Sequence, residues 1–172
     1  MREEGKAEII NGRIQRFMAS GDMPGRGAFN IALALATWNK IAKGGMIYPD
    51  GVGFLCDLAH RQSFSPDASY YTGVASGMKF LPTPPVFAVE VRSEGDYGAA
   101  MEREMEAKRA DYFATETEVV WDIDLLGETV IVRKYTKTGG ATTPVATFKR
   151  GDVADAEPAA PGFSMPVNDL FE

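Results

Sequence analysis

Two acidic residues in the middle of the chain have the type and the setting for metal-dependent chemistry. Glu90 lies in the apolar segment 85–93 (PVFAVEVRS), which predicts a strand. Side chains alternate between the two faces of a strand, so Glu90 shares its face with Arg92 and not with the large apolar residues. A bare carboxylate is costly to bury, and Glu90 therefore needs either a metal ion or a positive partner. That partner would be Arg92 or a base on a neighbouring strand.

Asp67 is the second candidate acid, because it directly precedes the strand expected at 68–71 (ASYY). Asp50 competes with it, but Asp50 lies in Pro-Asp-Gly, which is typical of a turn since glycine accepts a positive φ. No glycine follows Asp67, so its side chain should have a defined direction. It would serve either as a metal ligand or as an acceptor for nearby backbone N–H groups. Asp67 and Glu90 would supply the oxygen ligands that Mg²⁺ or Mn²⁺ prefers, with the Val91 carbonyl as a third.

Lys108 lies on the helix expected at 98–115. On a helical wheel its nearest neighbours are apolar or aromatic: Met101, Met105 and Tyr112. The residues on the other faces are charged and are expected to be solvated: Glu102, Glu106 and Arg109. Lys108 should therefore point inward. It would act either as a point charge for catalysis or as a lysine whose stem packs inward while its ammonium reaches solvent.

Three other reactive side chains rank below these. Glu8 shares a strand face with Ile10, and we expect it to be a surface charge of a hairpin rather than a helper acid. His60 is the only histidine, which argues against a His-rich zinc site and against Ser–His catalysis. Cys56 is the only cysteine, so no internal disulfide can form, and we expect it to be a core residue.

The elements that must position these residues include both strands and helices. Asn11-Gly12 is the preferred two-residue turn, so residues 7–17 should form a β-hairpin. Apolar residues recur at helical spacing from 28 to 43, after a glycine-rich loop at 20–27. The remaining segments are expected to be two or three strands within 46–71, strands at 86–92, 118–124, 128–135 and 144–149, a surface connection at 151–161 and a helical turn at 166–171. A helix on either side of a mixed β-sheet fits an α/β or α+β domain.

Size and charge limit the classes of protein that fit. With 172 residues, of which 45% are hydrophobic, the chain should form one domain over 1–172 with its own core. The formal net charge of −6 argues against a protein that coats nucleic acid through a general positive field. A single cysteine favours a reduced, cytoplasmic setting. No apolar run approaches the roughly 20 residues that cross a bilayer.

Six segments, in order, resemble the Uma2 family (DUF820), which falls within the PD-(D/E)xK restriction-endonuclease-like group. They are AEIINGRI at 7–14, PDASY at 66–70, FAVEVRS at 87–93, KRADY at 108–112, VVWDID at 119–124 and PGF at 161–163. The wider group has E-x-K on the strand. Here Arg92 takes the third position, and Lys108 matches a lysine that has moved to the helix.

The resemblance implies a restriction-endonuclease-like core with an N-terminal hairpin, and a Mg²⁺-dependent endonuclease that acts on DNA. Asp67 and Glu90 would be the metal ligands, and Lys108 the catalytic base or stabiliser. Arg92 would bind phosphate bidentately. The alternative is a catalytically silent binding or assembly module, since the histidine often found near the first helix of the family is absent at 26–30. An exposed hairpin and an acidic tail leave room for a homodimer.

Overall fold

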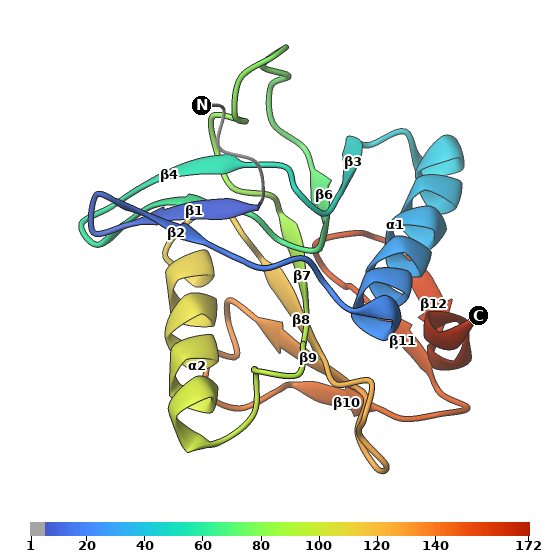
Figure 1. Ribbon diagram of the computed structural model, residues 1–172. Helices are drawn as coiled ribbons and strands as arrows, with labels where there is room; N and C mark the ends of the chain where they lie inside the picture. The colour runs from blue at the N-terminus through green and yellow to red at the C-terminus, as the bar shows by residue number, and fades with distance from the viewer. Residues whose placement is uncertain (1–5) are drawn as a thin grey trace.

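The strands form three sheets, described over residues 6–172 in the computed structural model (Figure 1). A four-stranded sheet has the order β2-β1-β5-β4, a six-stranded sheet has the order β10-β9-β8-β7-β6-β3, and β11 pairs with β12. The strands are β1 (Ala7–Ile10), β2 (Arg13–Arg16), β3 (Met46–Pro49), β4 (Phe54–Leu58), β5 (Arg61–Phe64), β6 (Ala68–Tyr71), β7 (Phe87–Val91), β8 (Val119–Ile123), β9 (Val132–Thr136), β10 (Ala146–Phe148), β11 (Val153–Asp155) and β12 (Ser164–Pro166).

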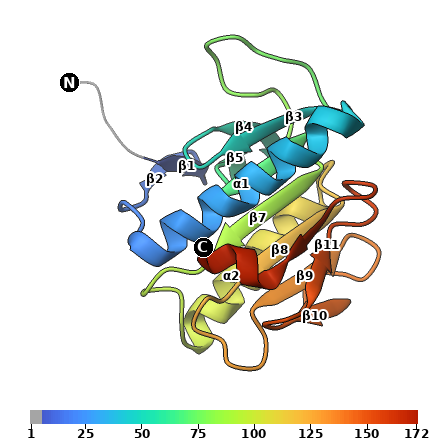
Figure 2. The ribbon, with the colours of Figure 1, turned by 90° about the vertical axis from the view of Figure 1, so that its right-hand side faces the viewer.

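Two helices flank the six-stranded sheet, α1 (Asp22–Ala42) on one face and α2 (Ala99–Phe113) on the other (Figures 1 and 2). The neighbours β7 and β8 are parallel, and α2 is the crossover that joins them, whereas the other neighbours in this sheet are antiparallel. The sheet is therefore mixed, which confirms the predicted α/β fold class. A short 3₁₀ helix, η1 (Val167–Phe171), packs beside α1 and confirms the final helical turn.

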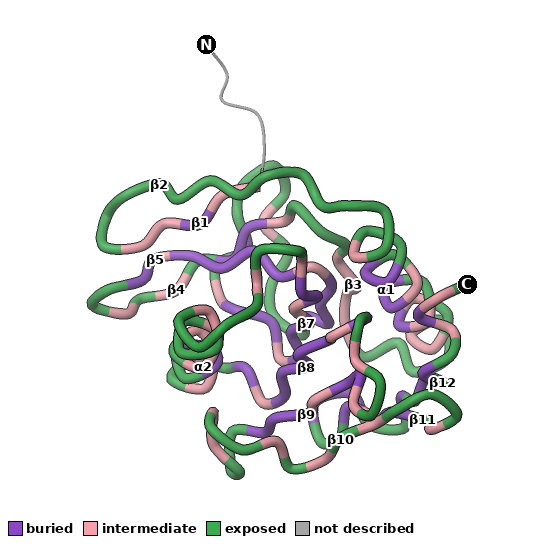
Figure 3. Tube along the Cα trace, turned by 60° about the horizontal axis from the view of Figure 1, so that its bottom comes forward, coloured by how far each residue is buried: buried purple, intermediate pink, exposed green. Residues whose placement is uncertain are grey.

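The core explains why the central strand reads as a continuous apolar run. On one face of β7, Phe87 and Val89 belong to the same apolar cluster as Ile31 and Leu35 of α1. On the other face, Ala88 joins a smaller cluster under α2. Both β7 and β8 lie in the buried interior of the molecule (Figure 3). A strand covered on both faces has little exposure for any charged side chain that it carries.

The predicted N-terminal hairpin is confirmed. Asn11 and Gly12 have φ values of 51° and 69°, which is the conformation that the two-residue turn requires. Ile10 also pairs with Arg61, so β1 lies between β2 and β5. Strand β1 therefore has a neighbour in the sheet on each of its two edges.

Helix α1 begins at Asp22, so the loop predicted at 20–27 is wrong. Pro24 is tolerated there because the first turn of a helix needs no N–H donor, and Asp22 is favourable near the positive end of the helix. Gly27 is buried, and a Cβ atom added to it would lie 3.2 Å from Leu125 Cδ1. This glycine therefore permits close packing and does not interrupt the helix.

Two further expectations about the chain are corrected. The region 46–71 contains four strands rather than two or three. The acidic segment 151–161 is not a surface connection, because it contains β11 and three alanines that are buried in the main core: Ala156, Ala159 and Ala160. The small alanine side chains fit closely beneath neighbouring elements. The polar residues between these alanines had led to the prediction of a solvated surface segment. No helix within 6–172 has the length and apolarity of a membrane span.

Candidate active site

Asp67 lies where the chain passes from β5, in the smaller sheet, to β6, in the larger one. Its backbone N–H donates to the Val89 carbonyl at 2.9 Å, which sets it beside the central strand β7. Its carboxylate oxygen Oδ2 accepts a hydrogen bond of 2.6 Å from the Val91 N–H. Asp67 thus acts as an acceptor for a backbone N–H group, which is one of its two expected roles. Its other carboxylate oxygen, Oδ1, contacts Lys6, as described below.

Glu90 points from β7 towards α2, as the alternation of side chains predicts. Its oxygen Oε1 accepts a 2.7 Å hydrogen bond from the Tyr112 hydroxyl and lies 2.9 Å from Lys108 Nζ. Neither ion-pair partner considered as the alternative to a metal, Arg92 or a base on a neighbouring strand, pairs with Glu90, because the base that does so comes from the helix. Burial raises the pKa of Glu90 above its ordinary value, and Asp67 adds to the effect while Lys108 opposes it.

Lys108 joins two acids from separate elements. Its Nζ lies 2.9 Å from Glu90 Oε1 and 2.9 Å from Glu8 Oε1, and its side chain is only 19% exposed. Burial acts to lower the pKa of Lys108, but Glu90 and Glu8 outweigh it, so the pKa lies above the ordinary value. Lys108 is therefore a charged ammonium that points inward, and it does not reach out to solvent.

Glu8 is completely buried, so the prediction of a surface charge on the hairpin is wrong. Besides Lys108, it contacts Arg61 Nη1 at 2.6 Å through Oε2, and its Oε1 accepts a 3.0 Å hydrogen bond from the Ser65 N–H. Burial acts to raise the pKa of Glu8, yet Lys108 and Arg61 bring it below the ordinary value. The alternation of side chains along the strand, which places Glu8 on the same face as Ile10, was the sequence signal that could have indicated burial. Its partner Arg61, on the neighbouring strand β5, is 53 residues away in the sequence.

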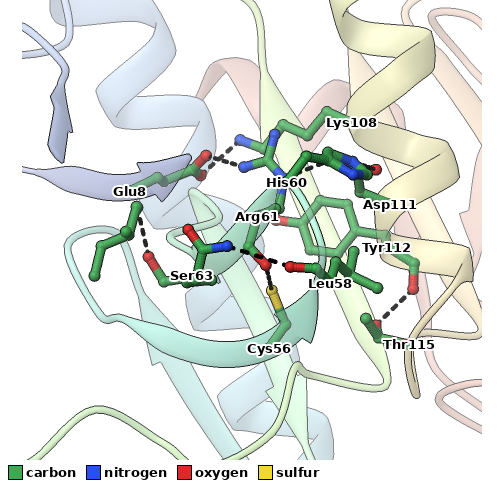
Figure 4. A network of polar contacts seen from close by, with 12 residues as sticks. Glu8, Cys56, Leu58, His60, Arg61, Ser63, Lys108, Asp111, Tyr112 and Thr115 are labelled. Atoms are coloured by element: carbon green, nitrogen blue, oxygen red, sulfur yellow. Dashed lines mark hydrogen bonds and ion pairs between the residues drawn. The ribbon is translucent and has the colours of Figure 1, made fainter. Parts of the chain in front are cut away.

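Arg61 continues this polar network towards the surface (Figure 4). The guanidinium lies between Glu8 and Asp111 of α2, whose Oδ2 accepts a 2.8 Å hydrogen bond from Arg61 Nε. His60 Nε2 lies 2.6 Å from the other oxygen of Asp111, and its side chain is 56% exposed. A continuous series of polar contacts therefore runs from His60 at the surface to Lys108 beside Glu90.

Lys6 is a second ammonium at the site. Its Nζ lies 2.5 Å from Asp67 Oδ1 and 2.9 Å from Asp50 Oδ1. Burial acts to lower the pKa of Lys6, but Asp67 and Glu90 raise it by a larger amount, so the amine stays protonated. No sequence motif had pointed to Lys6. Asp50 lies at the predicted turn, before Gly51 with its φ of +87°, and it accepts this ion pair as well.

Arg92 takes part in a different cluster from the one predicted. Its Nε and Nη2 each donate to Asp122 at 2.7 Å, and Nη1 and Nη2 also donate to Glu102. A guanidinium engaged by two carboxylates would have to break these bonds before it could bind phosphate. Arg109 was expected to be solvated, and this is wrong: it is buried, contacts Asp122 at 3.3 Å and stacks over Tyr135.

One pocket brings the predicted residues together. It has a volume of about 490 Å³, and the candidate residues Asp67, Glu90, Val91, Arg92 and Lys108 all contribute to its lining. The face of α2 that was expected to be apolar also borders this pocket, and Met101 and Met105 are only partly buried. Sequence reasoning missed two polar groups of the site, Lys6 and Arg61, and it misjudged Glu8 as a surface charge.

The donor set fits a hard divalent cation. Within residues 6–172, no three His, Cys, Asp or Glu side chains are grouped to hold a metal ion, so a bound ion would rely on two carboxylates. Mg²⁺ is commonly bound in this way, because it keeps several of its waters. Glu90 Oε2 accepts no hydrogen bond from the described part of the chain, and an ammonium already rests on Asp67 Oδ1. Positive charge is therefore favoured between these two acids.

A mixed sheet between two helices, with acids and a lysine gathered beside the central strand, is the architecture of the restriction-endonuclease-like fold. The chain itself belongs to the Uma2 family, described as "Putative restriction endonuclease", which it matches over residues 1–168. One solved structure that it resembles is "a putative nuclease belonging to DUF820 from Anabaena variabilis", with a TM-score of 0.73 and 15% sequence identity, covering 96% of this chain and 89% of that chain. At this identity the likeness shows the fold alone. No curated protein matches the sequence.

Proposed function

We propose that this protein is a nuclease that hydrolyses phosphodiester bonds in DNA with the help of Mg²⁺ or Mn²⁺. The observation that carries the proposal is that Asp67, Glu90 and Lys108 line a single pocket in a member of an endonuclease family. The structural relative from Anabaena variabilis, which is described as "a putative nuclease", also supports the proposal.

The metal would be held by Asp67 and Glu90, with the Val91 carbonyl as a third ligand. When bound, such an ion lowers the pKa of a coordinated water and polarises the phosphate. Each residue has a part that its contacts suggest. The Tyr112 hydroxyl bonds to Oε1 of Glu90 and so leaves Oε2 for the ligand role. The Val91 N–H fixes the carboxylate of Asp67 in the same manner.

Lys108 would neutralise the negative charge that builds on the phosphate oxygens during hydrolysis. Its ammonium is already held beside Glu90 by Glu8, so it needs little reorganisation when substrate arrives. Glu8 in turn is fixed by Arg61. Glu8 and Arg61 would thus position the lysine without touching DNA.

The proposal is tested by incubating supercoiled plasmid DNA with the protein and Mg²⁺ or Mn²⁺, alongside the variants Glu90→Gln and Asp67→Asn. We expect metal-dependent nicking by the wild type and its loss in both variants. Asp22→Asn is the matched control, because Asp22 is an exposed acid on α1 whose ion pair, over residues 6–172, is with its neighbour Arg26. Cleavage that survives in Glu90→Gln, or that is independent of metal, would contradict the proposal.

A binding module of the same fold that does not cut DNA is the second candidate. The contact between Lys6 and Asp67 favours it, because an ammonium already compensates the acid that a metal would need. Isothermal titration with Mn²⁺ separates the two candidates. Binding that disappears in Asp67→Asn supports the nuclease, and equal behaviour of the two proteins supports the silent module.

A further inference from the structure

The ammonium of Lys6 takes the place on Asp67 where a metal ligand bond would form. Of the two carboxylate oxygens, Oδ2 is committed to the Val91 N–H, and Oδ1 lies 2.5 Å from Lys6 Nζ. The pair is shielded from water, with side-chain exposures of 17% for Lys6 and 13% for Asp67. A charge-assisted contact at this distance is among the stronger hydrogen bonds of a protein.

A second acid offers the same ammonium another place to rest. Asp50 Oδ1 lies 2.9 Å from Lys6 Nζ, and its side chain is 40% exposed. Lys6 and Asp67 both line the pocket, whereas Asp50 does not. A small shift of Nζ away from Asp67 and onto Asp50 would therefore take the ammonium out of the pocket without leaving it unpaired.

We propose that Lys6 is a tethered counter-ion which a divalent cation must displace from Asp67, and that Asp50 receives the displaced ammonium. The inference rests on the proposed function, since it concerns the same metal ligands. Two partly buried acids that face one pocket repel each other, and Lys6 relieves this repulsion when no metal is bound. A divalent ion beside Asp67 and Glu90 would supply the compensation instead, and it would repel an ammonium that stayed on Oδ1.

The affinity of the protein for metal is therefore set by competition, and two substitutions should change it in opposite directions. Lys6→Met removes the competitor, and Mn²⁺ should bind about tenfold more tightly or better, which corresponds to the loss of one charge-assisted contact. Asp50→Asn removes the negative charge that would receive the ammonium, so that Lys6 stays more firmly on Asp67, and it should weaken Mn²⁺ binding several-fold.

The experiment measures the dissociation constant of Mn²⁺ by isothermal titration, in the absence of DNA, for the wild type and each variant. Lys134→Met is the matched control, because Lys134 forms a similarly short ion pair of 2.6 Å with Asp155, and neither residue lines the pocket. Its Mn²⁺ affinity should equal that of the wild type. Thermal unfolding without metal checks that each variant is folded. Asp50→Asn alters a partly exposed residue, so it tests the inference even if Lys6→Met does not fold.

The double variant Lys6→Met/Asp50→Asn separates a specific role of Asp50 from its general negative charge. If Asp50 acts by receiving Lys6, the Asp50→Asn substitution should have little effect once Lys6 is gone. An unchanged or weakened affinity in Lys6→Met would overturn the inference while leaving the nuclease proposal intact, provided that Asp67→Asn still abolishes binding. Failure of every protein, wild type included, to bind Mn²⁺ would overturn both.

Discussion

Glu8→Gln should destabilise the protein although it changes the size of the side chain very little. The carboxylate of Glu8 has no exposed surface and contacts both Arg61 and Lys108. Removing one partner from a buried ion pair costs about 3–5 kcal/mol. Arg61 keeps Asp111 and Lys108 keeps Glu90, so we expect the lower end, about 3 kcal/mol. For a chain of this size that lowers the melting temperature by about 6–12 °C.

The loss should also depend on pH in a defined direction. The pKa of Glu8 in the folded protein lies below its ordinary value of 4.5, so the folded state binds the Glu8 proton more weakly than the unfolded chain does. The stability that Glu8 contributes is therefore fully present above pH 4.5, and it is lost as the pH falls through the lowered pKa. The difference between wild type and Glu8→Gln should accordingly shrink in acid.

Thermal unfolding followed by circular dichroism, at neutral pH and in steps down to acid, measures both effects. Glu118→Gln is the control, because Glu118 pairs with Lys137 at 3.9 Å on the surface, where both side chains are about 40% exposed. Such a pair contributes about 0–1 kcal/mol. The reasoning is refuted if Glu8→Gln melts at the temperature of Glu118→Gln, or if its deficit is the same at every pH.

Three other substitutions test neighbouring parts of the structure. Glu90→Gln should keep or raise the melting temperature at neutral pH. The pKa of Glu90 in the folded protein is raised, so the charged carboxylate lowers the stability of the fold as the pH rises through this raised pKa. A fall of several degrees in the melting temperature would contradict this. Lys108→Met should destabilise the wild type by about 1–3 kcal/mol but the Glu90→Gln variant clearly less, and a double-mutant cycle that shows no coupling would argue against the ion pair. Gly45→Ala should cost about 1–3 kcal/mol, since its Cβ would lie 2.3 Å from the Tyr71 carbonyl oxygen, and chemical denaturation checks the value against wild type.

Local patterns predicted most of the elements and the candidate residues of the site. The Asn11-Gly12 turn, the apolar strand around Glu90 and the helix that carries Lys108 depend on backbone preferences and on spacing along a few residues. The same patterns misplaced the start of α1, because Gly27 resembles a loop residue until its contact with Leu125 is known. They also misjudged the alanine-rich tail, whose small side chains become buried only when it folds beneath the sheet.

The sequence by itself determined which way Glu90 and Lys108 would face, since the period of a strand or helix is a local property of the backbone. Only the tertiary structure decided which charges would meet. Glu8 and Arg61 are 53 residues apart, and they meet because β1 and β5 pair within one sheet. Lys6 and Asp67 are 61 residues apart, and they meet where the two sheets come together beside β7. A buried charge takes whichever opposite charge the packing brings within reach, and that choice depends on how distant segments pair and pack.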